Sequence, residues 1–223
     1  MQAVFTPERS TKIRLVFDAS AKGPDNKSLN DYLEKGPNYI NNIQDVLIAW
    51  RWDHVGYCGD LRKMFNQIRI HPEDQIYHRF LFRRNEDEDP KIFQWLRLNF
   101  GDKPAPDIAT GSIKVLAKAC QEDLSEASRQ LQDNVYVDDI GGSAPTPEKT
   151  QNIITDIDTI LNTGNFQVKS WNSNHKEVDK SKEKCTTFLG HKWNKEIDVF
   201  TFKKELDIRP DRNFGILSDW SCL

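Results

Sequence analysis

The chain has no CxxC pair, no long apolar run and no signal-like start, and each absence excludes a class of protein. The four cysteines are Cys58, Cys120, Cys185 and Cys222. Because they are far apart, they predict reduced thiols rather than a disulfide framework or a zinc site. No stretch approaches the roughly 20 apolar residues that cross a bilayer, and the N-terminus lacks the basic-then-apolar pattern of a secretory signal. We therefore expect an intracellular protein that does not contact a membrane.

Excess positive charge is also missing, because the formal net charge of the 223 residues is −3 at pH 7. Nucleic-acid phosphates are bound by Lys and Arg, but the distribution of charge matters more than its sum. Acidic residues are concentrated at 86–89, where a hairpin tip is expected, and basic residues are denser at 62–63, 69 and 79–84. The five histidines show no metal-ligand spacing and are expected to be surface or structural residues. A basic groove therefore remains compatible with the negative total.

Residue patterns predict strands and helices that alternate along the chain. The expected helices cover residues 43–50, 108–127 and 147–163. The expected strands cover residues 12–18, 55–59 and 67–70, with hairpins at 77–83/92–98, 134–137/140–143 and 188–193/199–202. Asn41 or Asn42 caps the first helix, Thr146 caps the last one, and Gly164 ends it. Frequent hairpins among helices predict an α+β fold, with an antiparallel sheet and helices on one face.

The sharpest feature is the sequence Tyr136-Val137-Asp138-Asp139 at an expected hairpin tip. Adjacent carboxylates repel each other, which is tolerable in water or beside a cation, so a solvated turn is the alternative for such a pair alone. Asp60 follows a short apolar strand far upstream. Carboxylate oxygens suit Mg²⁺, or Mn²⁺ in its place. Three acids on neighbouring strand ends could hold two ions about 4 Å apart, the arrangement used for in-line phosphoryl transfer.

These residues resemble the motifs of reverse transcriptases, in the order of that family, over about residues 12–195. Tyr136-Val137-Asp138-Asp139 matches the YxDD box, and residues 60–68 (DLRKMFNQI) resemble the first catalytic motif. Residues 100–106 (FGDKPAP) resemble the FG…AP box, and 188–193 (FLGHKW) is similar to the primer grip. The segment 12–22, with SLND at 28–31 and GP at 36–37, is similar to the BEL/Pao branch of LTR retrotransposons.

The resemblance implies the fingers and palm of a right-hand polymerase, with an antiparallel palm sheet backed by helices and a missing or truncated thumb. The implied parts are 1–52, the N-terminal fingers; 53–70, palm with the first catalytic motif; 71–100, the fingers hairpin; 101–195, palm with the YxDD hairpin and a primer-grip-like strand; and 196–223, the start of a truncated thumb or connection. The parent polyprotein would also carry a protease, an RNase H domain and an integrase.

The resemblance also implies roles for single residues. Asp60, Asp138 and Asp139 would be the catalytic acids of the metal site. Asp60 and Asp138 would bind two Mg²⁺ ions, Asp139 would lie beside them in the same site, and the Leu61 carbonyl would be a further ligand. The implied nucleotide-binding residues are Lys12, Arg14, Lys63, Met64, Phe65, Phe100, Gly101 and Lys169. The implied primer-binding residues are Tyr136, Phe188, Leu189 and Gly190.

Two of these roles have a specific chemistry. Phe65 would be the steric gate, whose ring fills the space that a ribose 2′-OH needs; a core aromatic on a short helix is its alternative. Lys169 is the candidate for protonating the pyrophosphate leaving group, with Lys176 and Lys192 as rivals. Lys12 and Arg14 would clamp the triphosphate, unless they are only a solvated strand edge.

Three positions depart from the family pattern. Gly59 stands where related elements often carry Ala, and little is expected to change there. Gly141-Gly142 follows the carboxylate pair and is expected to soften the hairpin. Asp102 places an acid in a box that is expected to face template and nucleotide.

The implied activity is RNA-directed DNA polymerisation, in which a primer 3′-OH attacks a dNTP on an RNA or DNA template. Two alternatives stay open: an RNA-dependent RNA polymerase with the same palm, and an inactive retrotransposon relic that folds as a palm or binds nucleic acid weakly. The resemblance implies a cytoplasmic location in a virus-like particle, with access to the nucleus.

Overall fold

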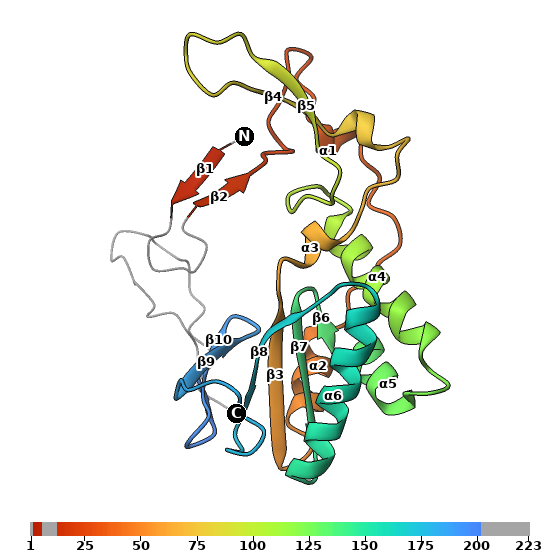
Figure 1. Cartoon of the computed structure of the whole chain (residues 1–223), viewed down its shortest axis with the longest axis vertical. Helices are drawn as coiled ribbons and strands as arrows, with labels where there is room; N and C mark the ends of the chain where they lie inside the picture. The colour runs from red at the N-terminus through yellow and green to blue at the C-terminus, as the bar shows by residue number, and fades with distance from the viewer. Residues whose placement is uncertain (1, 6–12, 202–223) are drawn as a thin grey trace, which may run out of the picture.

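The computed structural model describes residues 2–5 and 13–201, which form an elongated molecule with two halves (Figure 1). The upper half contains the hairpin β1 (Gln2–Phe5) and β2 (Ile13–Val16), the short helix α1 (Leu29–Tyr32), and the hairpin β4 (Arg79–Phe82) and β5 (Lys91–Gln94). The lower half is built on a four-stranded sheet. In the described part of the chain, no helix combines the length and the apolar character that crossing a bilayer requires.

The central sheet has the strand order β6-β7-β3-β8, and every neighbouring pair is antiparallel. The strands are β6 (Val135–Tyr136), β7 (Asp139–Ala144), β3 (Val55–Leu61) and β8 (Val168–Ser173). The predicted antiparallel sheet is therefore confirmed, although β8 was not predicted. Asp60 is the penultimate residue of β3 rather than the residue after it, because β3 runs two residues further than its apolar stretch.

Three helices cover one face of this sheet: α4 (Ala105–Ala119), α5 (Ser125–Asp133) and α6 (Pro147–Thr163) (Figure 1). The buried residues of α6 include the predicted apolar face, namely Ile153, Ile154, Ile157, Ile160 and Leu161. Its N-cap is Thr146, whose hydroxyl accepts a hydrogen bond from the Lys149 N–H at 3.3 Å. The spacing of the apolar residues and the cap together predicted this helix correctly.

The single helix predicted over residues 108–127 is wrong, because the chain turns at 120–124 and starts a second helix, α5. The two helices are tied together where the Ser128 hydroxyl donates to the Ala117 carbonyl at 2.7 Å. Neither Gly nor Pro marks this break. The turn brings Leu131 back into the core that contains Ala109 and Ile113, so tertiary packing overrides the local pattern.

The opposite face of the sheet is covered by α2 (Ile43–Trp50) and by a small sheet with the order β11-β10-β9. Its strands are β9 (Cys185–Phe188), β10 (His191–Asn194) and β11 (Val199–Thr201). Asn42 is the cap of α2, with its side chain accepting from Gln44 N at 2.8 Å. The buried residues of this second core are Val46, Trp50, Cys58, Phe188, Leu189 and Trp193.

Two predicted strands are corrected by the structure. The strand expected at 188–193 is a hairpin, because Leu189 and Gly190 adopt φ angles of 48° and 78° and form a two-residue turn between β9 and β10. The strand expected at 67–70 is replaced by the short helix α3 (Met64–Gln67), followed by an isolated bridge between Arg69 and Arg97. The hairpin predicted at 77–83/92–98 is confirmed as β4 and β5, with shorter strands.

Asp198 anchors the small sheet to the rest of the lower half. Its carboxylate accepts two hydrogen bonds from Arg51, at 2.7 and 2.8 Å, and others from Trp193 Nε1 at 2.9 Å and from Asn174. These donors come from the end of α2, from β10 and from the segment after β8. The hydrogen bond from Arg51, assisted by Trp193, lowers the pKa of Asp198 below its usual 3.8.

The Asp198→Asn variant is expected to lose about 1–2 kcal/mol of unfolding free energy near pH 7, a range reduced for partial exposure. A carboxyl whose pKa is lowered by folding stabilises the protein above its unfolded pKa, and this contribution disappears as pH falls through the folded pKa. Urea unfolding at pH 7, 5 and 3 should therefore show the wild-type and variant curves converging. Asp133→Asn, at the exposed end of α5, is the control. A gap that stays constant down to pH 3 would contradict the assignment.

Candidate active site

Asp60 and the carboxylate pair meet at one end of the central sheet. Asp60 on β3 is the register partner of Asp139 on β7, and facing residues of such a ladder have Cα atoms about 5 Å apart. The Leu61 N–H donates to the Asp138 carbonyl at 2.8 Å, which ties the end of β3 to the turn before β7. The backbone thus brings the three acids to one end of the sheet, as expected, while their grip on cations stays a prediction.

The three carboxylates differ in their surroundings. Asp60 and Asp138 are exposed, whereas Asp139 is half-buried. Burial and the negative charge of Asp138 raise the pKa of Asp139 to about 7; Asp60 adds to this shift, and a hydrogen bond from Leu189 opposes it. The raised pKa of Asp139 therefore reflects both lost solvation and repulsion between like charges. A divalent cation would relieve that repulsion.

The donor set suits Mg²⁺, since all three groups offer hard oxygen ligands. Within residues 2–5 and 13–201, however, no three His, Cys, Asp or Glu side chains already converge as a metal site. One oxygen of Asp139 is occupied, because Oδ2 accepts from the Leu189 N–H at 3.1 Å. The residues thus fit the ion in chemical type and in their place at one end of the sheet.

Packing holds the turn that carries Asp138. Tyr136 and Asp139 are register partners across a two-residue turn, and Val137 has a φ of 54°. A positive φ is unfavourable for a β-branched residue, and strain of this kind costs of the order of 1–3 kcal/mol. Tyr136 packs on the second core, beside residues such as Trp50 and Phe188. Tertiary contacts therefore keep the carboxylates at the sheet edge in a turn that this sequence alone disfavours.

The glycines beside the carboxylates are positions of close packing. A Cβ on Gly141 would lie 2.2 Å from Phe188 Cζ, and one on Gly142 would lie 2.5 Å from the Tyr57 hydroxyl. The expectation that this pair softens the hairpin is wrong, because both positions are filled by aromatic neighbours. A Cβ on Gly59 would lie 2.5 Å from Val168 Cγ1, so glycine is the residue that fits between β3 and β8 at this position.

A hollow of about 410 Å³ adjoins the carboxylates and is lined by Asp60, Asp139, Lys169 and Phe188, among others. Lys169 extends from β8 into the same space as the acids, whereas its rivals Lys176 and Lys192 do not line it. Two other lining residues, Asn172 and Ser181, are bonded by Lys195, a residue that the sequence analysis did not single out.

Lys195 lies in an expected turn, so nothing in the sequence marked it as a buried cation. It is only 4% exposed. Its Nζ lies 2.8 Å from both carboxylate oxygens of Asp179 and also bonds to Asn172 and Ser181, two of the residues that line the hollow.

The structure places the other predicted nucleotide residues around α3 and before α4. Lys63, with a φ of 50°, directly precedes α3. Met64 is buried. Phe65 is partly buried and packs against the core that contains Ala109 and Ile113, so part of its ring remains accessible. Phe100 is 39% exposed. Lys12 lies outside the described residues, and Arg14 is described only by its backbone in β2.

Asp102 does not face a template, contrary to expectation. It is buried, and its Oδ2 lies 3.4 Å from His78 Nδ1. Burial raises the pKa of Asp102, and the neighbouring His78 opposes this shift. The acid is therefore turned inward beside His78 without a hydrogen bond to it, and the exposed Phe100 lies two residues before it.

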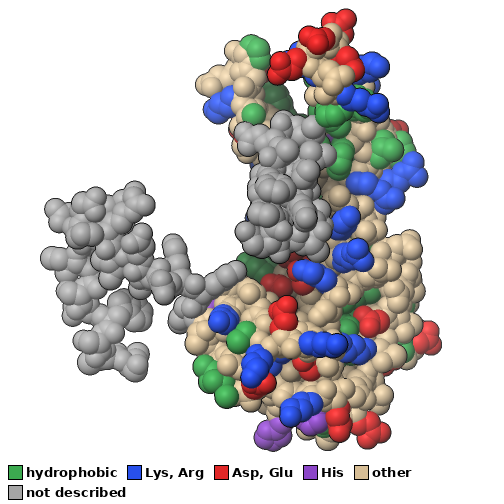
Figure 2. Space-filling view, turned by 60° about the vertical axis from the view of Figure 1, so that its left-hand side comes forward, with side chains coloured by type: hydrophobic (Ala, Val, Ile, Leu, Met, Phe, Trp, Pro, Cys, Tyr) green, Lys and Arg blue, Asp and Glu red, His purple; other side chains and the backbone are tan. Residues whose placement is uncertain are grey.

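The acidic hairpin tip is remote from the candidate site. Acidic side chains gather at the top of the molecule in Figure 2, where the exposed connection between β4 and β5 contains residues 86–89. Lys and Arg side chains lie beside that tip and, mixed with Asp and Glu, over the surface below it (Figure 2). A separate basic groove therefore stays a prediction.

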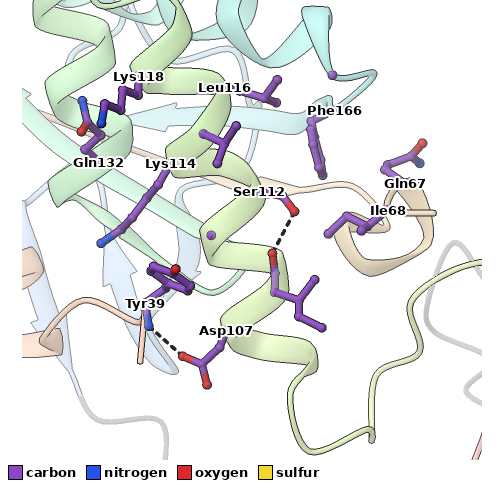
Figure 3. A pocket seen from close by; sticks show the side chains of 14 residues that line it. Tyr39, Gln67, Ile68, Asp107, Ser112, Lys114, Leu116, Lys118, Gln132 and Phe166 are labelled. Atoms are coloured by element: carbon purple, nitrogen blue, oxygen red, sulfur yellow. Dashed lines mark hydrogen bonds between the residues drawn. The ribbon is translucent and has the colours of Figure 1, made fainter. Parts of the chain in front are cut away.

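A larger hollow of about 600 Å³ lies on the outer side of α4 (Figure 3). It is lined mainly by apolar side chains such as Ile68, Val115 and Phe166, and at its edge the Tyr39 N–H donates to Asp107 at 2.9 Å. None of the predicted site residues lines it. The carboxylates, rather than the size of the cavity, therefore identify the candidate site.

Comparisons with known proteins agree with this geometry. The model of the family "Reverse transcriptase (RNA-dependent DNA polymerase)" matches residues 23–193. Among solved structures, the chain is similar to the foamy viral protease-reverse transcriptase in complex with double-stranded DNA, with 20% identity, a TM-score of 0.59, and coverage of 86% of this chain and 29% of that one.

Two further structures are similar at 20% identity. One is the Prototype Foamy Virus protease-reverse transcriptase, a selenomethionine-labelled mutant (TM-score 0.61, covering 91% of this chain and 22% of that one). The other is the foamy viral enzyme in complex with an RNA/DNA hybrid (TM-score 0.55, covering 82% and 22%). These likenesses show the fold of fingers and palm, and the chain spans less than a third of each of the three proteins. No curated protein sequence matches the chain.

Gly141→Ala is expected to lower the unfolding free energy by about 1–3 kcal/mol, the usual cost of overpacking a core. The added methyl group would meet the Phe188 ring, so Phe188→Leu in the same background should recover part of the loss. Thermal denaturation followed by circular dichroism measures both effects. Gly23→Ala, in an exposed turn where the nearest atom would be 3.2 Å away, is the control. Equal melting temperatures for the two alanine variants would show that the close contact is absent in solution.

Proposed function

Because the chain belongs to the reverse transcriptase (RNA-dependent DNA polymerase) family, we propose that it is the fingers-and-palm part of an RNA-directed DNA polymerase. It would add dNTPs to the 3′ end of a primer on an RNA or DNA template. The observation that carries this proposal is the register pairing of Asp60 with Asp139, with Asp138 in the adjoining turn. Nucleic acid as the partner is supported by the neighbours solved with double-stranded DNA and with an RNA/DNA hybrid.

Asp60 and Asp138, with the Leu61 carbonyl, would hold two Mg²⁺ or Mn²⁺ ions. Such a pair of ions, when bound, supplies activation of the attacking hydroxyl and stabilisation of the leaving oxygen. Asp139 would lie beside the ions, because its Oδ2 is already bonded to the Leu189 N–H. The three acids therefore divide into an exposed pair for cations and a half-buried neighbour.

The nucleotide would lie between α3 and the loop before α4. Backbone amides near Lys63 and Met64 would hold the triphosphate, and the Phe65 ring would exclude a ribose 2′-OH. Phe100 and Gly101 would lie under the nucleotide and the template base. Lys169, in the hollow with Asp60, would protonate the pyrophosphate. Lys12 and Arg14 are proposed as the fingers residues that clamp the triphosphate.

The primer 3′ end would rest against Tyr136, Phe188, Leu189 and Gly190. The first three belong to or pack on one core, and Gly190 is the exposed residue of the turn. We assign residues 1–52 and 71–100 to the fingers, 53–70 and 101–195 to the palm, and 196–223 to the start of a thumb or connection.

A BEL/Pao-type element is the proposed source of the chain, on the strength of its segments 12–22 and 28–37. Protease, RNase H and integrase domains would then be its partners in the parent polyprotein, within a cytoplasmic virus-like particle that gains access to the nucleus.

Primer extension on an oligo(dT)-primed RNA template, with Mg²⁺ or Mn²⁺, tests the proposal. Asp138→Asn is expected to lower extension by at least about 10³-fold, since it removes a charged ligand from the reacting centre. Asp133→Asn, an exposed acid at the end of α5, should match the wild type. If the wild-type chain extends no primer with either ion, the proposed activity is wrong for this chain, and the inactive palm is favoured.

Phe65→Val should let the chain incorporate ribonucleotides, because the smaller side chain leaves room for the 2′-OH. We expect the ratio of kcat/KM for dNTP over NTP to fall by at least about ten-fold, which corresponds to about 1.4 kcal/mol of discrimination. Single-nucleotide incorporation with matched dNTP and NTP measures this ratio. Efficient use of ribonucleotides by the wild type would instead indicate an RNA-making polymerase.

A further inference from the structure

The side chain of Asn30 joins α1 to the loop before α4 through both ends of its amide. Asn30 Nδ2 donates to the Gly101 carbonyl at 2.9 Å, and Oδ1 accepts from the Lys103 N–H at 2.7 Å. The two bonds link segments more than 70 residues apart in the sequence. Because the side chain uses a donor and an acceptor on the same loop, neither Asp nor Leu at this position could make both contacts.

Asn30 is itself held in place by its surroundings. Its N–H donates to the Ala19 carbonyl at 3.0 Å, and its Nδ2 also donates to the Ser20 hydroxyl at 3.0 Å. At the start of α1, the Ser28 N–H and hydroxyl both donate to Asp31 Oδ2, at 2.8 and 2.9 Å. The amide of Asn30 is therefore presented to the loop by a short helix that is fixed at its start and on its side.

A second contact from the loop reinforces this arrangement. The Lys103 ammonium group donates to the Leu33 carbonyl, just after α1. The region from Asn30 to Leu33 thus contacts the loop at three points, two of them through Asn30. We call these three contacts the α1 clamp.

The loop that the α1 clamp holds has an unusual conformation. Gly101 has a φ of 114°, and a Cβ there would lie 3.0 Å from the Phe17 carbonyl. The next residue, Asp102, is buried beside His78, whereas Phe100 before it remains 39% exposed. The loop therefore turns the Asp102 side chain inward and leaves the Phe100 ring accessible. The α1 clamp bonds to Gly101 and Lys103, the residues on both sides of Asp102.

We propose that Asn30 is a positioning residue for nucleotide binding, which holds Phe100 and Gly101 in the conformation that receives the incoming nucleotide and template base. The inference rests on the proposed polymerase function, because only that function makes Phe100 and Gly101 a binding surface. Asn30 acts through the loop and does not touch the substrate.

Two variants separate the contacts. Asn30→Asp keeps an acceptor for the Lys103 N–H but places a carboxylate oxygen against the Gly101 carbonyl. Asn30→Leu removes both bonds at similar size. Asn38→Asp is the matched control, because it makes the same amide-to-carboxylate change at an exposed residue whose Oδ1 alone is used, accepting from Ile40 N at 3.2 Å.

Steady-state primer extension with the full chain measures KM for dNTP and kcat for each variant. Both Asn30 variants should raise KM for dNTP about ten-fold, as expected for the loss of about 1.4 kcal/mol of binding free energy. kcat and the Kd for primer-template should change less than about three-fold, about 0.65 kcal/mol. Amide hydrogen exchange at Lys103 should be faster in Asn30→Leu, with unchanged exchange in β3 and β7. The Asn38→Asp control should match the wild type in every measurement.

Other outcomes overturn the inference in distinguishable ways. If the wild type extends primers and the Asn30 variants keep its KM for dNTP, Asn30 has no positioning role while the polymerase assignment stands. If the Asn30 variants lower the melting temperature and also change kcat and primer affinity as much as KM, Asn30 is only a structural residue. If the wild type extends no primer, the inference fails together with the proposed function, even where exchange at Lys103 still reports the clamp.

Discussion

Like charge held at the end of one sheet is the constraint on which the rest of the structure depends. The pairing of β3 with β7 puts Asp60 opposite Asp139, and the turn before β7 adds Asp138. Burial and the negative charge of Asp138 raise the pKa of Asp139, so the sheet must be stable enough to hold like charges close together. Its stability comes from burial on both faces, with helices on one side and with α2 and the small sheet on the other.

The small sheet is held on the central sheet by both apolar and charged contacts. Phe188 fills the space over Gly141, Asp198 collects donors from three segments, and Lys195 is neutralised by Asp179 in a buried pair. Breaking a buried pair leaves an uncompensated charge, which costs more than the pair contributes. The turn of β9 and β10 is therefore fixed relative to the carboxylates by packing and by charge at once.

The sequence predicted what depends on local patterns and missed what depends on tertiary contacts. Helix α6 was correct because its apolar period and its Thr146 cap are both local. The break between α4 and α5 has no Gly or Pro, and it exists because Leu131 returns to the core. The close packing at the glycines 59, 141 and 142 was not predicted, because only the neighbouring strands and rings show why a Cβ cannot fit there. The acids were predicted because metal-dependent chemistry requires several carboxylates close together. Nothing in the sequence around Asn30 indicated its contacts with a distant loop.

Asp139 connects the two hairpins that form the candidate site. Its backbone pairs with β3 and β6, while its Oδ2 accepts the Leu189 N–H of the β9–β10 turn. A carboxylate oxygen bonded in this way is less available to a cation than an oxygen that faces water. The same bond joins the β9–β10 turn to Asp139. One interaction would therefore set the positions of both the primer end and the acids. The three acids are thus unequal in their surroundings: under the proposed function, Asp60 and Asp138 would hold the ions, and Asp139 would join the primer surface to the reacting centre.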